Sequence, residues 1–185
     1  MRKSKQETAE TRRRILREAG IALRRKGIQA TGIADLMAAA GLTHGGFYRH
    51  FPSKEDLVAE ACATCLMGPD LPAPETDKGG LATMAEAYLS PKHRDNPDTG
   101  CVFAGLGSEL ARADRKTREA ATAGFLRMME AAMRGGRKAT VKAAKERAMV
   151  AIAAMVGAVT LSRVVTDPKL SAAILASTRR YVANM

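Results

Sequence analysis

Hydroxyl, imidazole and aromatic side chains are concentrated in one short stretch of this 185-residue chain, residues 43–51. Phe47 and Phe51 are four positions apart, so on a helix they share one side and are expected to pack inward. The outward side then carries Thr43, His44, Gly45, Tyr48 and His50. Hydroxyl, imidazole and bare backbone groups on one exposed face suit contacts with base edges and phosphates.

The segments on either side of this stretch predict a helix-turn-helix. Residues 33–40 carry an apolar stripe typical of a short helix, and Gly41 supplies a turn in which a side chain would be strained. Pro52 ends the second helix of the motif. Ser53 stands three residues before Asp56, which predicts the capped start of a connecting helix over residues 53–67.

The remaining elements are also expected to be helical, because no segment alternates with a period of two. A long first helix is predicted over residues 5–26, and the later helices over residues 80–90, 102–112, 114–134, 139–166 and 168–183. The proline- and glycine-rich segment 68–80 is the best linker. We therefore predict an all-α fold of about nine helices. A three-helix DNA-binding domain occupies residues 1–67, and a helical ligand-binding and dimerisation domain occupies residues 68–185.

The charge of the chain favours a polyanionic partner, since its formal net charge is +11 and ten basic residues stand against three acidic ones in the first 26. Arginines 12–14 either form a solvated face or approach phosphates. The hydrophobic share of 46% excludes a disordered chain. The most apolar run, residues 148–161, is shorter than the roughly 18–20 residues that span a bilayer, so no membrane partner is expected.

The cysteines predict a reducing, cytoplasmic setting, because they are three in number and no apolar signal region follows the basic start. Cys62 and Cys65 form a single pair with no second pair to complete a zinc site. The sequence also has no Ser/His/Asp set and no phosphate-cradling loop. We therefore expect no metal, no cofactor and no enzymatic activity.

The stretch from Thr31 to Leu57 resembles the DNA-binding domain of the TetR family of regulators, and the likeness covers about residues 10–60. It rests on Gly27, Thr31, Ala39-Ala40-Gly41, the cluster from Phe47 to Phe51, and the restart from Ser53 to Leu57. The resemblance implies DNA contacts by Thr31, Thr43, His44, Gly45, Tyr48, His50 and Lys54. Lys54 would hold a phosphate at a helix N-terminus. Gly32 and Ala34 depart from the polar residues of many relatives, which implies fewer contacts from the first motif helix.

Two apolar stripes on the helix over residues 139–166 predict that it is buried on two sides, one within its own chain and one against a second copy. The last helix has a compatible stripe, and pairing of these two helices is also the usual arrangement in the TetR family. The predicted homodimer interface consists of Ala148, Ala151, Met155, Ala158, Ser162, Ile174 and Tyr181. The alternative is a core that lies wholly within one chain.

An effector pocket is expected among residues 80–134 and the start of the following helix. Its candidate lining is Met84, Tyr88, Phe103, Leu106, Phe125, Met128 and Met129. A methionine-rich wall suits an apolar ligand, and the alternative for each residue is plain core. Cys101 follows Gly100 at a helix start, where the helix dipole would lower its pKa. It is therefore a candidate sensor of electrophiles or oxidants, or else a buried inert cysteine.

These features and the resemblance predict a ligand-responsive transcriptional regulator, a repressor rather than an activator. It would bind a palindromic operator in double-stranded DNA as a homodimer and be released by a small molecule or an electrophile. The competing interpretation is a non-specific architectural DNA-binding protein, which would bind without sequence preference. A basic amphipathic membrane binder is less favoured, because the helices have ordinary core stripes.

Overall fold

The computed structural model describes residues 5–64, 80–134 and 140–185. Its helices are α1 (Lys5–Lys26), α2 (Ile33–Ala39), the 3-10 helix η1 (His44–Arg49), α3 (Lys54–Thr64), α4 (Gly80–Tyr88), α5 (Pro91–Asp95), the 3-10 helix η2 (Pro97–Thr99), α6 (Val102–Leu110), α7 (Arg115–Met133), α8 (Val141–Val164) and α9 (Pro168–Ala183). These ranges contain no strand, so the all-α prediction is confirmed. The predicted boundary at residues 67–68, most of the linker 68–80, and Cys65 lie outside the described residues.

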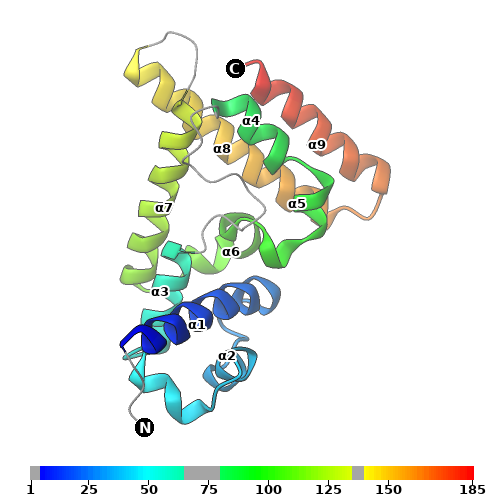
Figure 1. Ribbon diagram of the computed structural model, residues 1–185. Coiled ribbons are helices and arrows are strands. Elements are labelled where there is room, and N and C mark those ends of the chain that lie inside the picture. Colours follow the sequence, from blue (N-terminus) through cyan, green and yellow to red (C-terminus); the bar gives the residue numbers. More distant parts are fainter. Residues whose placement is uncertain (1–4, 65–79, 135–139) are drawn as a thin grey trace.

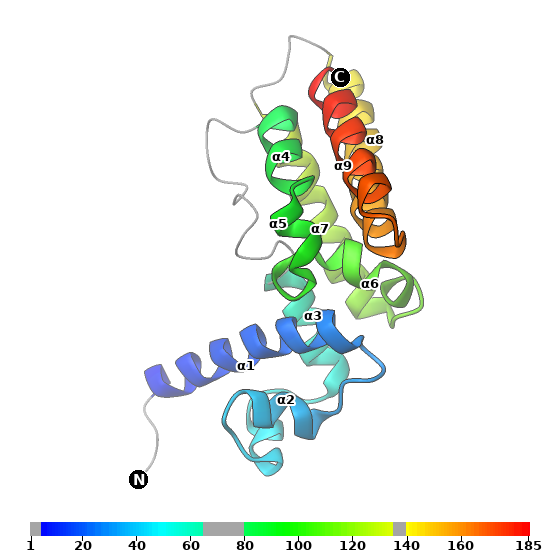
Figure 2. The same cartoon turned by 90° about the vertical axis from the view of Figure 1, so that its right-hand side faces the viewer.

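The N-terminal helices form a small bundle at one end of the molecule, and α4–α9 form a larger one beyond it (Figures 1 and 2). Within the small bundle α1 packs on α2 and α3, and α2 packs on η1. α3 continues from the small bundle against α7, and α1 also touches α6 and η2. In the larger bundle α8 and α9 lie side by side, as both views show. The helices thus lie in two groups, and the domain bounds expected from the sequence stay a prediction.

Several helices begin and end at the capping and helix-ending residues that the sequence contains. Gly27 ends α1 with φ at +89°, a left-handed conformation that glycine adopts without strain. The Ser53 hydroxyl accepts the Asp56 N–H at 3.1 Å and donates to the Asp56 carboxylate at 2.9 Å. Asp114 caps α7 by accepting the Thr117 N–H at 3.0 Å. The sequence treats residues 91–100 as a separator, whereas the structure folds them into α5 and η2.

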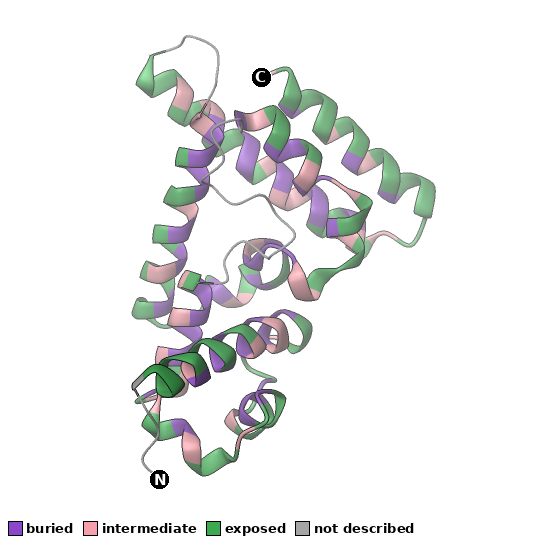
Figure 3. Cartoon of the chain, viewed as in Figure 1, coloured by how far each residue is buried: buried purple, intermediate pink, exposed green. Residues whose placement is uncertain are grey.

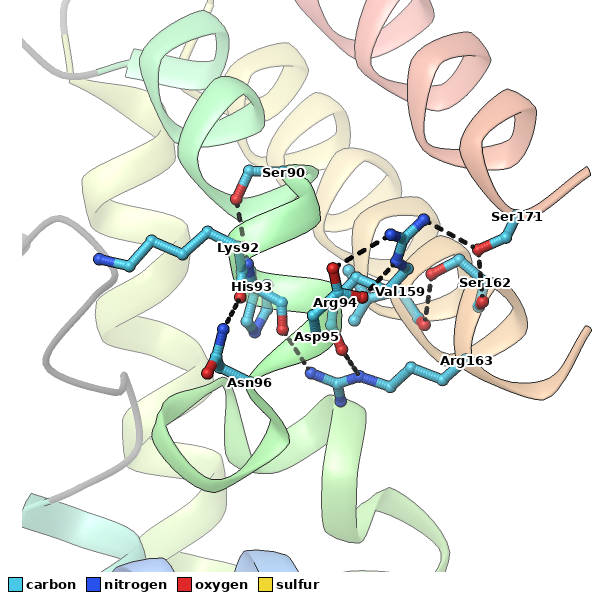
Figure 4. Close-up of polar contacts among 10 residues, drawn as sticks. All are labelled: Ser90, Lys92, His93, Arg94, Asp95, Asn96, Val159, Ser162, Arg163 and Ser171. Atoms are coloured by element: carbon cyan, nitrogen blue, oxygen red, sulfur yellow. Dashed lines mark hydrogen bonds and ion pairs between the residues drawn. The ribbon is translucent and has the colours of Figure 1, made fainter. Parts of the chain in front are cut away.

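α5 is held by a polar network that joins it to α8 and α9 (Figure 4). Arg163 of α8 donates to the carbonyl oxygens of His93 and Arg94, at 2.7 and 2.9 Å. Arg94 in turn donates to the Ser171 hydroxyl of α9 at 3.2 Å, and that hydroxyl donates to the Ser162 carbonyl at 2.6 Å. These bonds satisfy the free carbonyl groups at the end of α5, which explains why so short a helix is ordered.

α8 is the helix that carries the apolar run 148–161. It is 24 residues long, so the described chain includes one helix long and apolar enough to cross a membrane by length and composition alone. Core helices of soluble proteins have the same property, and 39% of its most apolar window is buried. Figure 3 shows buried positions along the side of α8 that faces the bundle.

Candidate DNA-reading site

The core of the reading site is a pair of phenylalanines under η1. Phe47 is fully buried and Phe51 is 1% exposed, and their ring centroids are 5.8 Å apart. Both pack inward, as their spacing predicts. Tyr48 stands edge-on to Phe47 at 5.2 Å and is 64% exposed. An aromatic ring so exposed gains little from packing, so its place on the surface favours contact with a partner.

η1 differs from the α-helix that the sequence predicts, because it is a 3-10 helix of six residues. Two glycines, Gly45 and Gly46, weaken the α-helical state by about 1 kcal/mol each relative to alanine. Short 3-10 segments are a common outcome where an α-helix has little intrinsic support. Thr43 is the N-cap residue, but its side chain makes no capping bond and is exposed. Its hydroxyl is therefore accessible to an external partner.

Arg12 of α1 braces the end of this segment from behind. Its guanidinium forms an ion pair with Glu60 of α3, in which a second N–H donates to Glu60 Oε2 at 2.6 Å. The same group lies 4.5 Å from the centroid of the Phe51 ring, and its Nε donates to the His50 carbonyl at 3.4 Å. Arg12 therefore has a third role, different from the solvated face and the phosphate contact that the sequence left open. Arg12 joins three parts of the domain.

The structure brings most of the predicted DNA-contacting residues to one surface. Thr43, His44, Gly45 and Tyr48 are exposed on or just before η1. His50 and Lys54 are half-buried just beyond it.

Thr31 is a correction to the predicted set. Its side chain is fully buried and its hydroxyl donates to the Gly27 carbonyl at 2.6 Å, so it stabilises the turn after α1 and is not presented to DNA.

Sequence reasoning left out two residues that the structure places in functional positions. Arg49 is exposed on η1 beside Tyr48, where it presents a positive charge on the reading face. Its position between Tyr48 and His50 could have identified Arg49 from the sequence as a candidate for DNA contact. Glu109 of α6 accepts two backbone N–H groups from the turn after α1. No signal in the sequence could reveal that contact, because it joins residues about 80 positions apart.

The candidate pocket residues lie on α4, α6 and α7. Five of them are buried, namely Met84, Tyr88, Leu106, Met128 and Met129. Phe103 and Phe125 are half-buried and contact each other edge to face, with centroids 6.1 Å apart. Leu106 also lines a cavity of about 10 Å³ between α1, α3 and α6, which has room for about one water molecule. The ligand-binding role of the seven residues stays a prediction.

Cys101 is the N-cap residue of α6, as its sequence position suggests, but the predicted lowering of its pKa is wrong. The side chain is fully buried, and this burial raises the pKa of the thiol, although the Tyr88 hydroxyl and the first amides of α6 act in the opposite direction. Desolvation of the thiolate outweighs the helix dipole here. A raised pKa favours the alternative of an inert cysteine.

The predicted dimer interface also needs a correction. The five residues on α8, namely Ala148, Ala151, Met155, Ala158 and Ser162, are all buried inside a single chain. Small residues allow α8 to approach its neighbours in the same subunit closely, so this stripe is intrachain core. On α9, Ile174 is half-buried and Tyr181 is 69% exposed, so these two positions remain accessible to a second copy.

These observations define an all-α protein with a helix-turn-helix at one end and a larger group of helices at the other. The sequence profile of "Bacterial regulatory proteins, tetR family" matches residues 15–61. The N-terminal segment, residues 15–61, thus matches the DNA-binding part of the TetR family.

Two transcriptional regulators match a part of the chain. The chain is 42% identical over 59 residues to the transcriptional regulator AcrR of Shigella flexneri, which covers 32% of this chain and 27% of that protein. It is 40% identical over 58 residues to TtgR of Pseudomonas putida, covering 31% and 28%. The alignments therefore span about a quarter of the length of these relatives.

Solved structures extend the likeness in fold over the whole chain. The reduced form of Escherichia coli NemR has a TM-score of 0.72 at 18% identity, over 95% of this chain and 96% of that one. A TetR transcriptional regulator from Chloroflexus aurantiacus has a TM-score of 0.70 at 26% identity, over 97% and 95%.

Proposed function

We propose that this protein is a ligand-responsive transcriptional regulator that binds a palindromic operator as a homodimer and acts as a repressor. The observation that carries the proposal is the exposed face of η1, with Thr43, His44 and Tyr48 outward over buried Phe47 and Phe51. A rigid apolar underside and a polar outer side are what a helix needs to enter a major groove and read base edges.

The homodimer rests on an apolar face of α8 and α9 that the single chain leaves uncovered. Its exposed large residues are Met149, Val150, Leu161, Val164, Leu170 and Tyr181. This face replaces the stripe predicted from the sequence and is offset from it around α8. Two-fold pairing of α8 and α9 would bury it and would place two copies of η1 for two half-sites about one helical turn of DNA apart.

The effector is proposed to bind in the larger domain, close to the Phe103 and Phe125 rings, and to be a small apolar molecule. By favouring one arrangement of the dimer over another, it would change the spacing of the two η1 helices and release the operator. Release by an electrophile through Cys101 is the less favoured route, since that thiol is buried. Such a regulator would act in the cytoplasm, where the DNA is.

Selection of bound fragments from a random DNA pool, at about 150 mM salt, tests this function directly. The full chain is expected to enrich one palindrome. A Tyr48→Ala variant should fold normally, because the ring is exposed and packs only edge-on to Phe47, and it should lose the enrichment if the ring contacts DNA as proposed. Salt-sensitive retention of DNA with no enriched sequence would instead support the architectural alternative.

A further inference from the structure

Helix α6 is fixed to the larger domain at its first turns. The Cys101 N–H donates to Nε2 of the buried His93 at 2.9 Å, and the Thr160 hydroxyl of α8 donates to the Ala104 carbonyl at 3.3 Å. Leu106 and Leu110 bury the same helix in the core. α6 is therefore joined to α5, α8 and the core, so we expect a displacement of these elements to move α6 as well.

At the other end of α6, the Glu109 side chain forms hydrogen bonds with the backbone of the small domain. Glu109 Oε2 accepts the Ile28 N–H at 2.7 Å and the Gln29 N–H at 3.1 Å. Gly27 makes this approach possible, since a Cβ there would lie 2.6 Å from Glu109 Oε1. A carboxylate that accepts two backbone N–H groups forms charge-assisted bonds, which are roughly twice as strong as neutral ones.

The turn that Glu109 holds leads directly into the reading motif. Thr31 closes the turn on Gly27 through its buried hydroxyl, and α2 begins two residues later at Ile33. α2 packs against η1. The direction in which α2 and η1 leave the long α1 helix therefore depends on the conformation of residues 27–31.

A cleft of about 200 Å³ opens beside this contact, between the two domains. Ile28, Lys54 and Val58 line it from the small domain, and Glu109, Arg112 and Asp114 from the larger one. Farther along the junction, α3 meets α7 through the surface pair of Lys116 with Asp56 and through Arg127, which donates to the Ala63 carbonyl at 2.9 Å. Neither of these contacts involves the turn that leads into α2.

We infer that Glu109 is the positioning residue through which the larger domain sets the orientation of the DNA-reading segment, an inference that rests on the proposed function. Its carboxylate ties the end of α6 to the turn before α2. A shift of α6 stretches or breaks two hydrogen bonds and frees the turn. Glu109 touches no DNA and acts only through residues 27–31.

The test compares the full chain with Glu109→Ala, Glu109→Gln and a matched control, Glu119→Ala. Glu119 is an exposed glutamate of α7 that, among the described residues, pairs with Arg115 on the same helix, so it reports the effect of losing one negative charge. Two quantities are measured for each variant. They are the affinity for the selected palindrome and the hydrogen exchange of the Ile28 and Gln29 amides in the absence of DNA.

Glu109→Ala is expected to speed exchange at both amides at least tenfold and to weaken palindrome binding about five- to thirtyfold. Glu109→Gln keeps an acceptor oxygen, so its amide exchange rates and its palindrome affinity should stay close to those of the wild type. The Glu119→Ala control should bind as tightly as the wild type or slightly more tightly. Unchanged exchange in Glu109→Ala, or binding within twofold of the control, would overturn the inference. If amide exchange is faster in Glu109→Ala but the wild-type chain selects no DNA sequence, the proposed function is rejected, while the contact of Glu109 with the turn is supported.

Discussion

Replacing Glu60 by glutamine should weaken operator binding, although it removes a negative charge from a DNA-binding domain. The formal net charge of the chain would rise from its present +11, and attraction to phosphates alone would then strengthen binding. The structure leads to the opposite expectation, because Glu60 holds Arg12 in place behind η1. Substitution of Glu60 therefore separates two effects on DNA affinity, the positioning of η1 by Arg12 and the electrostatic attraction of the chain to phosphates.

The size of the effect follows from the exposure of the pair. The two side chains are 37% and 32% exposed, so the ion pair contributes about 0.5–1 kcal/mol after screening by solvent. The contact of Arg12 with the Phe51 ring adds about 0.5–1 kcal/mol. Arg12→Ala loses both contributions, about 1–2 kcal/mol, which sets an upper bound of roughly 30-fold on the weakening of binding. Glu60→Gln loses only the ion pair and should weaken binding about 2–5-fold.

The assay is operator affinity as a function of salt for wild type, Arg12→Ala, Glu60→Gln and the exposed neighbour Arg13→Ala. We expect Arg12→Ala to lower affinity at every salt concentration with no change in the slope of log affinity against log salt. Arg12→Lys should not rescue it, because an ammonium cannot form the two parallel bonds. A slope reduced by about 0.9 in Arg12→Ala, or tighter binding by Glu60→Gln, would refute the reasoning.

Three further outcomes follow from the described contacts. Asp114→Ala should destabilise the fold by about 1 kcal/mol in thermal unfolding and Asp114→Asn by much less, since both Asp and Asn can cap α7. The hydrogen bonds from Thr117 lower the pKa of Asp114 in the folded state. The stabilisation by Asp114 is therefore complete above the pKa of the unfolded state, about 3.8, and is lost as the pH falls through the lower pKa of the folded state. A wild-type unfolding midpoint that does not fall on acidification, relative to Asp114→Asn, would count against this. Cys101 should react with iodoacetamide far more slowly in the native chain than in the unfolded one, and comparable rates would show that the thiol is accessible. Gly100→Ala should cost about 1–3 kcal/mol, because its Cβ would lie 2.7 Å from the buried His93 ring, and an unchanged melting temperature would contradict that packing.

The sequence predicts the fold class, most helix bounds and the reading face, because each depends on local information. Phe47 and Phe51 are separated by one helical turn, and Ser53 caps a helix that starts at the next residue. Local patterns also identify Tyr48 as exposed. These predictions needed no knowledge of the tertiary structure.

The errors about α8 and Cys101 concern contacts between distant segments. The sequence correctly predicts that the Ala148 stripe of α8 is buried, but periodicity does not say that the neighbour covering it belongs to the same chain. Cys101 lies at a helix N-terminus, which favours a low pKa, but the burial that raises the pKa comes from residues far along the chain. Thr31 and Glu109 meet the turn after α1 in ways that only the folded structure reveals.

The central claim, that η1 reads a DNA sequence, is tested most directly by a ratio of affinities measured with the full chain at one salt concentration. The affinity for the selected palindrome is divided by that for a scrambled duplex of the same length and composition. The account predicts a ratio of about 10³ or more for wild type, falling steeply in Tyr48→Ala. A ratio near one for wild type would contradict it.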